Sequence, residues 1–541
     1  MPFTPDMRRK VDQIRDYLYG GGYPDPLTNA EQLSFLFFFY MIEGIDSANL
    51  RQARATGRAY DSLFAGDWTL RNPLNAPSRG VEIVPRERMR WSSWANAMSG
   101  EQLVTWVRDE VFEFFREIGD AYGMGFMAHA RLAIDEPTVL TQIVTLVNEL
   151  RLEHADPDSK GDLFEHVLRQ IRQAGELGQF RTPRHIIRAI VDLVDPRIGE
   201  TVYDPAAGTA GFLVAAFDHI RLANSSPHGR ETAEFEGKTF ERGYGDRLND
   251  AQWRNLRTAT FYGNDVDAKM VSLASMNLAL RGLPDVRILR RNVLTTSFDR
   301  QMKAERSLPL DGYNVVLANP PFSGRIDRDR IVDDVKVGAT TATELLFVKY
   351  MVDNLKPDGR CGVIVPEGVL FGSTGAHKEL RRILLQNNRV EAVLSLPGGV
   401  FQPYSGVKTS VLILRKGGRT ECVMFLQTDA DGFKLDANHD QPIEADDLPN
   451  LIAAFTNRDE LLPDWRDRDA AAPWTEKWWF ATADLIEDED WNLSASRYRP
   501  ESREAAEHRD PRELLAELRD ETAAILGDIE ALAADLREQA V

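Results

Sequence analysis

The stretch TVYDPAAGTAGFLVAAFDHI, residues Thr201–Ile220, reads as a strand, a small-residue loop and a helix in succession. The β-rich run ends at Asp204, and the run with helical character begins at Gly211. Small residues between them let the backbone approach a ligand closely, while the amides at the start of the helix face it. The loop has neither the G-x-G-x-x-G pattern of dinucleotide-binding proteins nor the lysine of a P-loop. The stretch therefore predicts a ligand-binding loop of another kind, with a tight turn that binds nothing as the alternative.

Further β-rich runs follow this unit and alternate with helical runs. The β-rich runs are TFYGND, VRIL, YNVVLANPP, CGVIVP, VEAVLSL and KTSVLIL. Helical stretches such as AKMVSLASMNLALRG and TELLFVKYMVDNL lie between them. This alternation predicts an α/β fold with a largely parallel, doubly wound sheet that has helices on both faces. Sheets of this kind bind their ligands at the carboxyl ends of the strands.

Composition excludes several classes of protein. The chain has 541 residues, which predicts two or three domains, and its formal net charge of −19 argues against a simple DNA-coating protein. Two cysteines, Cys361 and Cys422, exclude a disulfide framework and a cysteine-rich zinc site. The start MPFTPDMRRK lacks the apolar core of a signal peptide, and the run Leu33–Ile42 is half of the roughly 20 residues that span a bilayer. We therefore expect a cytoplasmic protein that is not bound to a membrane.

The character of the sequence changes along the chain and predicts four parts. Residues 1–160 predict an N-terminal helical domain, and residues 161–430 hold the alternating strands and helices. Residues 431–505 are acidic, and we expect them to form an irregular extension. Residues 506–541 carry apolar side chains at three- and four-residue spacing, which predicts a C-terminal heptad helix. Such a helix either packs on its own domain or joins another subunit, and the spacing leaves both open.

Polar residues follow two neighbouring β-rich runs. A carboxylate at Asp265 could accept hydrogen bonds from both hydroxyls of a ribose, although a lone Asp after a strand is often only a helix cap. Asn292 could hydrogen-bond the edge of an adenine while Val293 covers its face, and a simple turn asparagine is the alternative. Together with the small-residue loop, these strand ends predict a site for an adenosine-bearing cofactor.

The fourth β-rich run ends in the tetrapeptide Asn319-Pro320-Pro321-Phe322. An exocyclic amine on a base is a poor nucleophile because its lone pair is delocalised into the ring. The side-chain oxygen of Asn319 and the carbonyl of Pro320 could accept its two hydrogens and localise that lone pair. The prolines hold the carbonyl in one orientation and offer no competing amide donor. Phe322 could stack on the base, so the tetrapeptide predicts a catalytic site for an aromatic amine.

These motifs resemble those of the amino-methyltransferases, whose signature is [DNS]-P-P-[FYW] and whose methyl donor is S-adenosylmethionine. The longer resemblance is to the modification subunits of type I restriction-modification systems, which make N6-methyladenine in DNA. It covers almost the whole chain and rests on GQFRTPR (Gly178–Arg184), DPAAGTAGF, GRCGVIVPEGVLF, LPGGVF, GVKTSVLIL and WNLSASRY. The resemblance implies the class I S-adenosylmethionine-dependent methyltransferase fold.

The resemblance also implies which residues hold the cofactor and that the reaction needs no metal. The segment GQFRTPR, in which Arg181 replaces the usual aromatic, would wrap the methionine end of S-adenosylmethionine. The candidate cofactor-binding residues are Gln179, Phe180, Arg181, Thr182, Pro183, Arg184, Asp204, Ala206, Gly208, Thr209, Ala210, Gly211, Asp265, Asn292 and Val293.

The implied activity is site-specific methylation of adenine N6 in double-stranded DNA, on an adenine flipped out of the duplex. Arg325, Arg328 and Arg330 follow Phe322 and could meet phosphates near the flipped base, with a solvated loop as the alternative. The expected partners are a specificity subunit, a second copy of this chain and, in some complexes, a restriction subunit. Two other functions stay open. One is methylation of an RNA base or a protein glutamine, and the other is a catalytically degenerate scaffold for assembly or defence.

Overall fold

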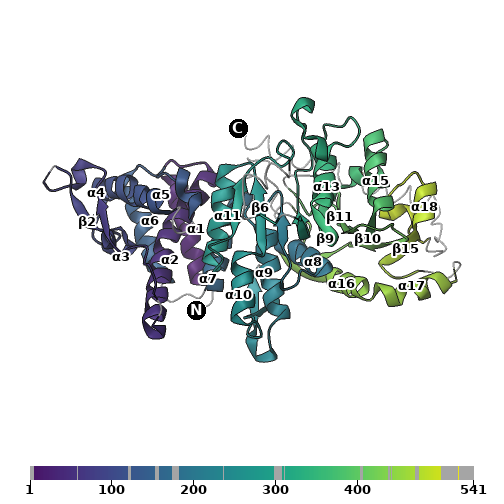
Figure 1. Ribbon diagram of the computed structural model, residues 1–541, viewed down its shortest axis with the longest axis horizontal. Coiled ribbons are helices and arrows are strands. Elements are labelled where there is room, and N and C mark those ends of the chain that lie inside the picture. The colour runs from purple at the N-terminus through teal and green to yellow at the C-terminus, as the bar shows by residue number, and fades with distance from the viewer. Residues whose placement is uncertain are drawn as a thin grey trace.

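The computed structural model describes residues 5–57, 59–78, 80–119, 124–152, 157–173, 182–235, 237–297, 308–309, 311–402, 406–436, 439, 441–469 and 474–500, with the single residues 519 and 522. The predicted heptad helix lies almost entirely outside these residues, as do Gln179, Phe180 and Arg181 of the cofactor segment. Figure 1 shows an elongated molecule with the N-terminal helices at one end and β15, α17 and α18 at the other. No helix among the described residues combines the length and apolar character that crossing a membrane requires.

The N-terminal region is helical, as predicted. Its described α-helices are α1 (Pro5–Gly20), α2 (Pro26–Thr56), α3 (Trp91–Trp94), α4 (Gly100–Trp106), α5 (Phe112–Ile118), α6 (Pro137–Glu149) and α7 (Pro157–Gln173). A short hairpin of β1 (Asp67–Thr69) and β2 (Ile83–Pro85) lies between α2 and α3. Helix α2 starts where Asp25 accepts hydrogen bonds from the amides of Leu27 and Thr28, which the first turn of a helix otherwise leaves unsatisfied.

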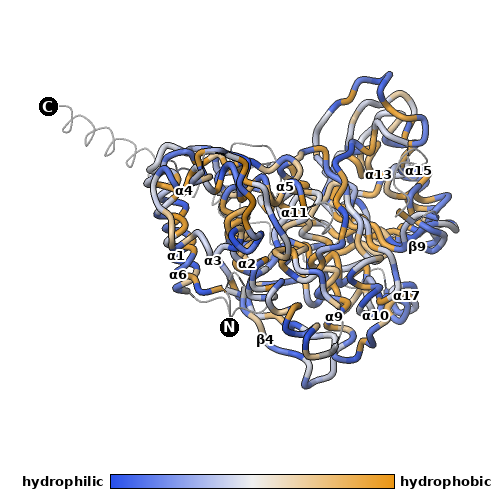
Figure 2. Tube along the Cα trace, turned by 60° about the vertical axis from the view of Figure 1, so that its left-hand side comes forward, coloured by the Kyte–Doolittle hydropathy of each residue, from blue (hydrophilic) through white to orange (hydrophobic). Residues whose placement is uncertain are grey.

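The apolar faces of these helices form one cluster that continues into the next region. The cluster includes Leu163 and Phe164 of α7 and also Leu273 and Met276 of α11 (Ala268–Leu280). Figure 2 shows apolar residues gathered on the inner sides of the helices. Helix α11 therefore packs against both the N-terminal helices and the sheet region, and it holds the two together.

Within the described residues, nine strands form the central sheet, in the order β15-β12-β10-β11-β9-β8-β3-β6-β7. Their bounds are β3 (Val202–Asp204), β6 (Phe261–Asp265), β7 (Arg287–Arg290), β8 (Tyr313–Ala318), β9 (Leu355–Pro366), β10 (Asn388–Ser395), β11 (Thr409–Lys416), β12 (Cys422–Gln427) and β15 (Trp478–Thr482). Strands β7, β6, β3, β8 and β9 are parallel, whereas β11 is antiparallel to both β9 and β10. After β3 the chain continues to β6 on one side of it and later returns to β8 on the other side. The strand order therefore reverses at β3, and sheets of this kind bind their ligands at such a position.

Helices cover both faces of the sheet, so the predicted doubly wound α/β fold is confirmed. Along β8, Val315 and Leu317 belong to the apolar cluster on one face, and Val316 and Ala318 belong to the cluster on the other. The first face carries α8 (Arg184–Val194), α9 (Gly211–Ala223) and α16 (Leu448–Thr456), and the second carries α13 (Thr343–Asp353), α14 (Glu367–Phe371) and α15 (Gly375–Asn387). Figure 1 shows α13 and α15 on the opposite side of the sheet from α8, α9 and α16.

The prediction of an irregular extension for residues 431–505 is wrong. This part contains β13 (Asp431–Phe433), β14 (Pro442–Asp446), α16, α17 (Arg458–Asp467), β15 and α18 (Ala483–Asp488). Strand β15 pairs with β12 and completes the edge of the central sheet. The elements of this part are short: β15 buries Trp479 and Phe480, whereas α17 and β14 have no buried residues. Helix α10 (Asp250–Thr258) and the hairpin of β4 (Arg230–Phe235) and β5 (Lys238–Gly243) lie in the polar stretch after α9.

Candidate active site

A pocket of about 510 Å³ lies at the carboxyl ends of β3, β6, β7 and β8. Eight of the residues predicted from sequence line it: Ala206, Gly208, Asp265, Asn292, Asn319, Pro321, Arg325 and Arg330. The structure adds Pro205, Val266, Leu294, Ile326, Asp327, Thr343 and Phe347. Parallel strands end at the same edge of a sheet, so residues far apart in the sequence meet here.

The small-residue loop connects β3 to α9 and forms one wall of the pocket. Gly208 has a positive φ of 51°, and open space surrounds the position that a Cβ would take. Pro205 and Ala206 line the pocket with it, whereas Thr209 and Ala210 do not. The carbonyl of Thr209 accepts a hydrogen bond from the buried Asn277 on α11, and Ala210 is buried just before α9. The loop is therefore fixed from behind, and its surface at Ala206 and Gly208 faces the ligand space.

Two carboxyl groups lie at the ends of β3 and β6. Asp265 accepts hydrogen bonds from the amides of Gly208 and Asp267, both at 2.9 Å, and these bonds orient its carboxylate at the pocket. Burial raises the pKa of Asp265, although the two amides favour its charged form. Asp204 is almost fully buried, and this burial raises its pKa to about 8, against the opposing effect of a hydrogen bond from the amide of Ala206. Asp265 is the carboxyl group that a ligand can reach.

After β7, Asn292 lines the pocket but Val293 does not. The amide of Leu294 donates to Oδ1 of Asn292 at 3.0 Å, which shows the turn geometry that was the alternative at this position. Val293 is only 1% exposed and packs in the apolar cluster that includes Tyr203, so the expectation that it covers a ligand is not supported. The turn directs Leu294 to the pocket in its place. Leu294 is itself only 2% exposed, so Val266, which is 58% exposed, is the apolar side chain of this wall that is open to a planar ring.

Asn319 follows the end of β8, and the nitrogen and oxygen of its side-chain amide differ in their hydrogen bonding. Its Nδ2 donates to the hydroxyl of Thr182 at 2.9 Å. Its Oδ1 is buried and accepts no hydrogen bond from any residue that the structure describes. A buried acceptor without a donor is unfavourable unless a ligand supplies one, and the pocket is where that ligand would lie. The Thr182 bond thus directs the free acceptor of Asn319 toward an incoming hydrogen-bond donor.

Phe322 is not exposed to the pocket, contrary to the prediction that it forms a stacking platform. Its side chain is 5% exposed and packs edge-on against Phe401, with ring centroids 5.0 Å apart and planes at 85°. After the two prolines the chain directs this ring into the apolar cluster of one sheet face instead. Pro321 is exposed at the pocket and Pro320 is buried. Phe322 could reach a base only by leaving Phe401.

The basic loop after the tetrapeptide lies partly at the pocket. Arg325 and Arg330 line it, and the exposed Arg328 begins the short 3-10 helix Arg328–Arg330. Thr343, at the start of α13, also lines the pocket, and its buried hydroxyl has no hydrogen-bond partner among the described residues. Sequence reasoning missed Thr343 and Phe347 because α13 shows an ordinary helical pattern, which does not reveal the face turned to a ligand.

Arg184 lies in a buried network of charges and not at the pocket. Its guanidinium pairs with Glu165 of α7 and donates to the carbonyl of Gly211 at 3.1 Å. Its side chain is 6% exposed, so the prediction of a direct cofactor contact is not supported. Thr182 and Pro183 precede it, and Pro183 stands immediately before α8. The predicted segment thus splits, with Thr182 at Asn319 and Arg184 behind the small-residue loop.

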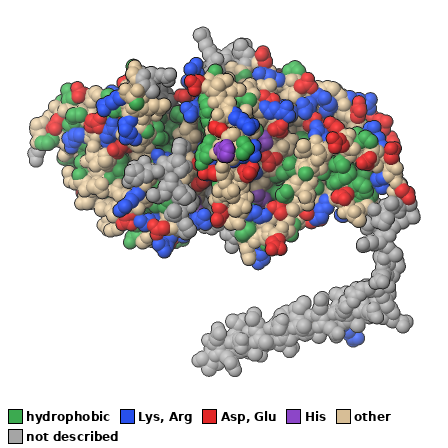
Figure 3. Space-filling model, turned by 90° about the horizontal axis from the view of Figure 1, so that it is seen from below, with side chains coloured by type: hydrophobic (Ala, Val, Ile, Leu, Met, Phe, Trp, Pro, Cys, Tyr) green, Lys and Arg blue, Asp and Glu red, His purple; other side chains and the backbone are tan. Residues whose placement is uncertain are grey.

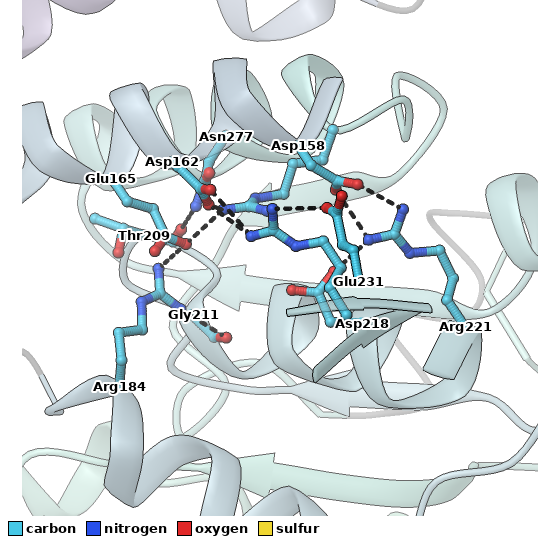
Figure 4. A network of polar contacts seen from close by, with 12 residues as sticks. Asp158, Asp162, Glu165, Arg184, Thr209, Gly211, Asp218, Arg221, Glu231 and Asn277 are labelled. Atoms are coloured by element: carbon cyan, nitrogen blue, oxygen red, sulfur yellow. Dashed lines mark hydrogen bonds and ion pairs between the residues drawn. The ribbon is translucent and has the colours of Figure 1, made fainter. Parts of the chain in front are cut away.

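The network that Arg184 joins connects α7 to the sheet region (Figure 4). Carboxylates of α7 face arginines of α9, β5 and the residue after α11 in the following pairs: Asp158 with Arg221 at 2.9 Å, Asp162 with Arg242 at 3.0 Å, and Glu165 with Arg281 at 3.0 Å. Burial would lower the pKa of Arg281, but the surrounding carboxylates raise it well above its usual range. Because a buried charge without its partner is costly, the network fixes α7 relative to the small-residue loop.

Comparisons with known proteins agree with this architecture. A family model described as N-6 DNA Methylase matches residues 155–507. The methylase subunit of the type I restriction enzyme EcoEI from Escherichia coli is 28% identical over 457 residues, which cover 81% of this chain and 84% of that protein. A solved structure from work on complex assembly and conformational transition of the type I restriction-modification system is 25% identical, covers 99% of both chains and gives a TM-score of 0.63.

A second solved structure shows the same fold. It is the type I restriction-modification system methyltransferase subunit from Streptococcus thermophilus, 17% identical, with a TM-score of 0.64 over 91% of this chain and 98% of that one. The resemblance and the class I methyltransferase fold expected from sequence are thereby confirmed. Since the family model matches more than half of the sequence, the chain belongs to the N-6 DNA methylase family.

Proposed function

We propose that this chain transfers a methyl group from S-adenosylmethionine to N6 of an adenine that has been flipped out of double-stranded DNA. The observation that carries the proposal is the buried side-chain oxygen of Asn319, which lacks a donor among the described residues and lies at the pocket. An exocyclic amine is a donor that fits this acceptor. Membership of the N-6 DNA methylase family supports the same reaction.

The residues of the pocket fit S-adenosylmethionine. A volume of about 510 Å³ is within the range of small-molecule sites. Asp265 is oriented to accept hydrogen bonds from ribose hydroxyls, and Val266 offers an exposed apolar surface to an adenine ring. Asn292 is placed to bond the edge of that ring. When bound, S-adenosylmethionine supplies a methyl carbon activated by a positively charged sulfur.

The tetrapeptide Asn319–Phe322 binds the target amine and activates it for methyl transfer. The target amine donates its two hydrogens to Oδ1 of Asn319 and to the carbonyl of Pro320, which localises the lone pair on N6. That lone pair forms the new nitrogen–carbon bond as the carbon–sulfur bond breaks and its electrons pass to sulfur. The amine becomes positively charged, so the two acceptors bind it more strongly in the transition state, and it then loses one proton to solvent. Phe322 stacks on the base only after its ring rotates away from Phe401.

Contacts to DNA are divided between this chain and a partner. We assign Arg325, Arg328 and Arg330 to phosphates beside the flipped nucleotide, since all three are exposed and two line the pocket. The rest of the surface is poorly suited to a duplex. The net charge is −19, and Figure 3 shows Lys and Arg interspersed with Asp and Glu on the face in view. We therefore propose that a specificity subunit reads the sequence, that two copies of this chain join it, and that a restriction subunit is an optional further partner.

Mass spectrometry of DNA nucleosides tests the proposal. The experiment combines the purified chain and its specificity subunit with DNA and with S-adenosylmethionine that carries a labelled methyl group. The DNA is then digested, and its nucleosides are separated by chromatography. We expect the label in N6-methyladenine, with little product when the specificity subunit is left out. Asn319→Ala is the inactive control and Lys378→Ala, which changes a half-buried side chain away from the pocket, is the matched active control. Label on another base or on protein, from a complex that binds DNA, would contradict the assignment.

A further inference from the structure

Two histidines and one aspartate from distant parts of the chain meet outside the pocket. His185 lies in the first turn of α8, Asp431 begins β13, and His439 lies in the loop between β13 and β14. His185 and Asp431 are 246 positions apart in the sequence. The side chains of Asp431 and His439 are fully buried, and that of His185 is 15% exposed. The proposed methyl transfer uses none of these three residues.

Their ligand atoms converge on one point. Nε2 of His185 and Nε2 of His439 each lie 3.0 Å from the same oxygen, Oδ2 of Asp431. All three ligand atoms lie within 4.8 Å of one another. Nitrogen and oxygen ligands of one tetrahedral zinc ion, at bond lengths of about 2.0–2.2 Å, stand roughly 3.3 Å apart. The two nitrogen–oxygen separations are thus close to this spacing, and the third separation, between the two Nε2 atoms, is within 4.8 Å.

The surroundings hold these ligands in place. The other oxygen of Asp431, Oδ1, accepts a hydrogen bond from the amide of Phe433 at 3.2 Å, which orients the carboxylate. The ring of Phe433 stacks on His185, with centroids 4.4 Å apart, and is edge-on to His439. These contacts hold the carboxylate and both rings in fixed positions relative to one another.

His219 lies elsewhere in the chain and also contacts carboxylates, but its contacts do not meet at one point. His219 contacts Asp192 through Nδ1 and Asp195 through Nε2, both at 2.9 Å. Its two carboxylates lie on opposite sides of the ring, so these contacts have no common point for an ion. In the group of His185, Asp431 and His439, both histidines present Nε2 to one carboxylate oxygen. His219 is thus a matched control within the same chain.

We propose that His185, Asp431 and His439 bind a divalent transition-metal ion, with zinc as the expected occupant. Two imidazole nitrogens and one carboxylate suit zinc and its neighbours in the first transition row, whereas magnesium and calcium prefer oxygen ligands. A fourth position is left for water. The ion would join the start of α8, directly after Thr182 and Arg184, to the β13–β14 hairpin, and its role would be structural. The rival arrangement has no metal, with the two Nε2–H groups donating to ionised Asp431.

Metal analysis of the full chain decides between the two. The chain is purified without an oligohistidine tag, and its metal content is measured by mass spectrometry for the parent, Asp431→Asn, His185→Gln and the control His219→Gln. We expect about one zinc per chain in the parent and the control. Each ligand variant should lose affinity by at least the roughly 10–100-fold that is typical of changes around metal ligands. His185→Gln lies at the exposed edge of the group and serves if Asp431→Asn does not fold.

A thermal measurement gives a second readout that does not depend on methyl transfer. Chelation followed by addition of zinc chloride alone should lower and then restore the melting temperature of the parent and of His219→Gln, but not that of the folded ligand variants. The proposal is overturned if the parent binds no metal and its melting temperature is the same with and without Zn²⁺, Co²⁺, Ni²⁺ and Mn²⁺. It is equally overturned if His185→Gln and Asp431→Asn retain full zinc, or if His219→Gln loses it.

Discussion

Replacing Asn319 by alanine removes the acceptor on which the proposed reaction depends, and the structure allows the two consequences to be separated. The first is the effect on stability. Only the bond from Nδ2 to Thr182 is lost, at 2.9 Å, because Oδ1 accepts nothing from the described residues. A neutral hydrogen bond contributes about 0.5–1.5 kcal/mol, so the free energy of unfolding should fall by no more than that.

The second consequence is the effect on rate. The acceptor is worth most when the amine becomes positively charged, and loss of one such preorganised group typically lowers the rate roughly 10²–10³-fold, or about 2.7–4 kcal/mol. Thr182→Val keeps the shape of the neighbour but removes the hydroxyl that orients Asn319. We expect a smaller loss there, up to roughly tenfold, because one neutral hydrogen bond is removed.

The two changes should not be additive. Thr182 is a positioning residue that acts on the amine through Asn319, so Thr182→Val should have no further effect in the Asn319→Ala background. The assay is single-turnover transfer of labelled methyl groups to target DNA by the assembled complex, at saturating S-adenosylmethionine. Calorimetry of cofactor binding and thermal unfolding serve as controls. Transfer at the parental rate by Asn319→Ala would refute the acceptor mechanism, and rate losses that simply multiply would refute the role given to Thr182.

Three further variants test neighbouring residues. Asp265→Ala should weaken the binding of S-adenosylmethionine roughly 10–100-fold, since hydrogen bonds to a charged group contribute about 1.5–3 kcal/mol, and unchanged affinity in calorimetry would show that the ribose assignment is wrong. Burial raises the pKa of Asp204 from 3.8 to about 8, so the folded state holds this proton more tightly than the unfolded chain does. The contribution of Asp204 to the free energy of unfolding therefore falls as the pH rises from 3.8 to about 8. Asparagine cannot ionise, so Asp204→Asn should melt above the parent at pH 9 and by a smaller margin at pH 5, and an equal margin at both would contradict the shift. Arg184→Met should lower the free energy of unfolding by about 3 kcal/mol in urea titrations, because the buried Glu165 loses an arginine partner, whereas normal stability with lost cofactor affinity would point to a direct contact.

The sequence by itself determined the architecture around the pocket. The period of apolar residues distinguishes strands from helices, and alternation of the two leaves a doubly wound sheet as the arrangement that buries both faces. From that topology it follows that Gly208, Asp265 and Asn319 meet, since each stands at the carboxyl end of a parallel strand. These inferences needed only the order of elements and the residue at each strand end.

Only the tertiary structure decided which way individual side chains point. Phe322 and Val293 follow strand ends as the lining residues do, yet both are buried, because the turns after the strands direct them into apolar clusters. Arg184 belongs to the segment Gly178–Arg184 that was expected to hold the cofactor, but its carboxylate partner Glu165 is on α7, outside that segment. The convergence of His185 with Asp431 spans 246 positions and leaves no local pattern in the sequence. The period of apolar residues shows which residues share a face of one helix or strand. Contacts between elements depend on how those faces pack, and this packing is determined only when the whole chain is folded.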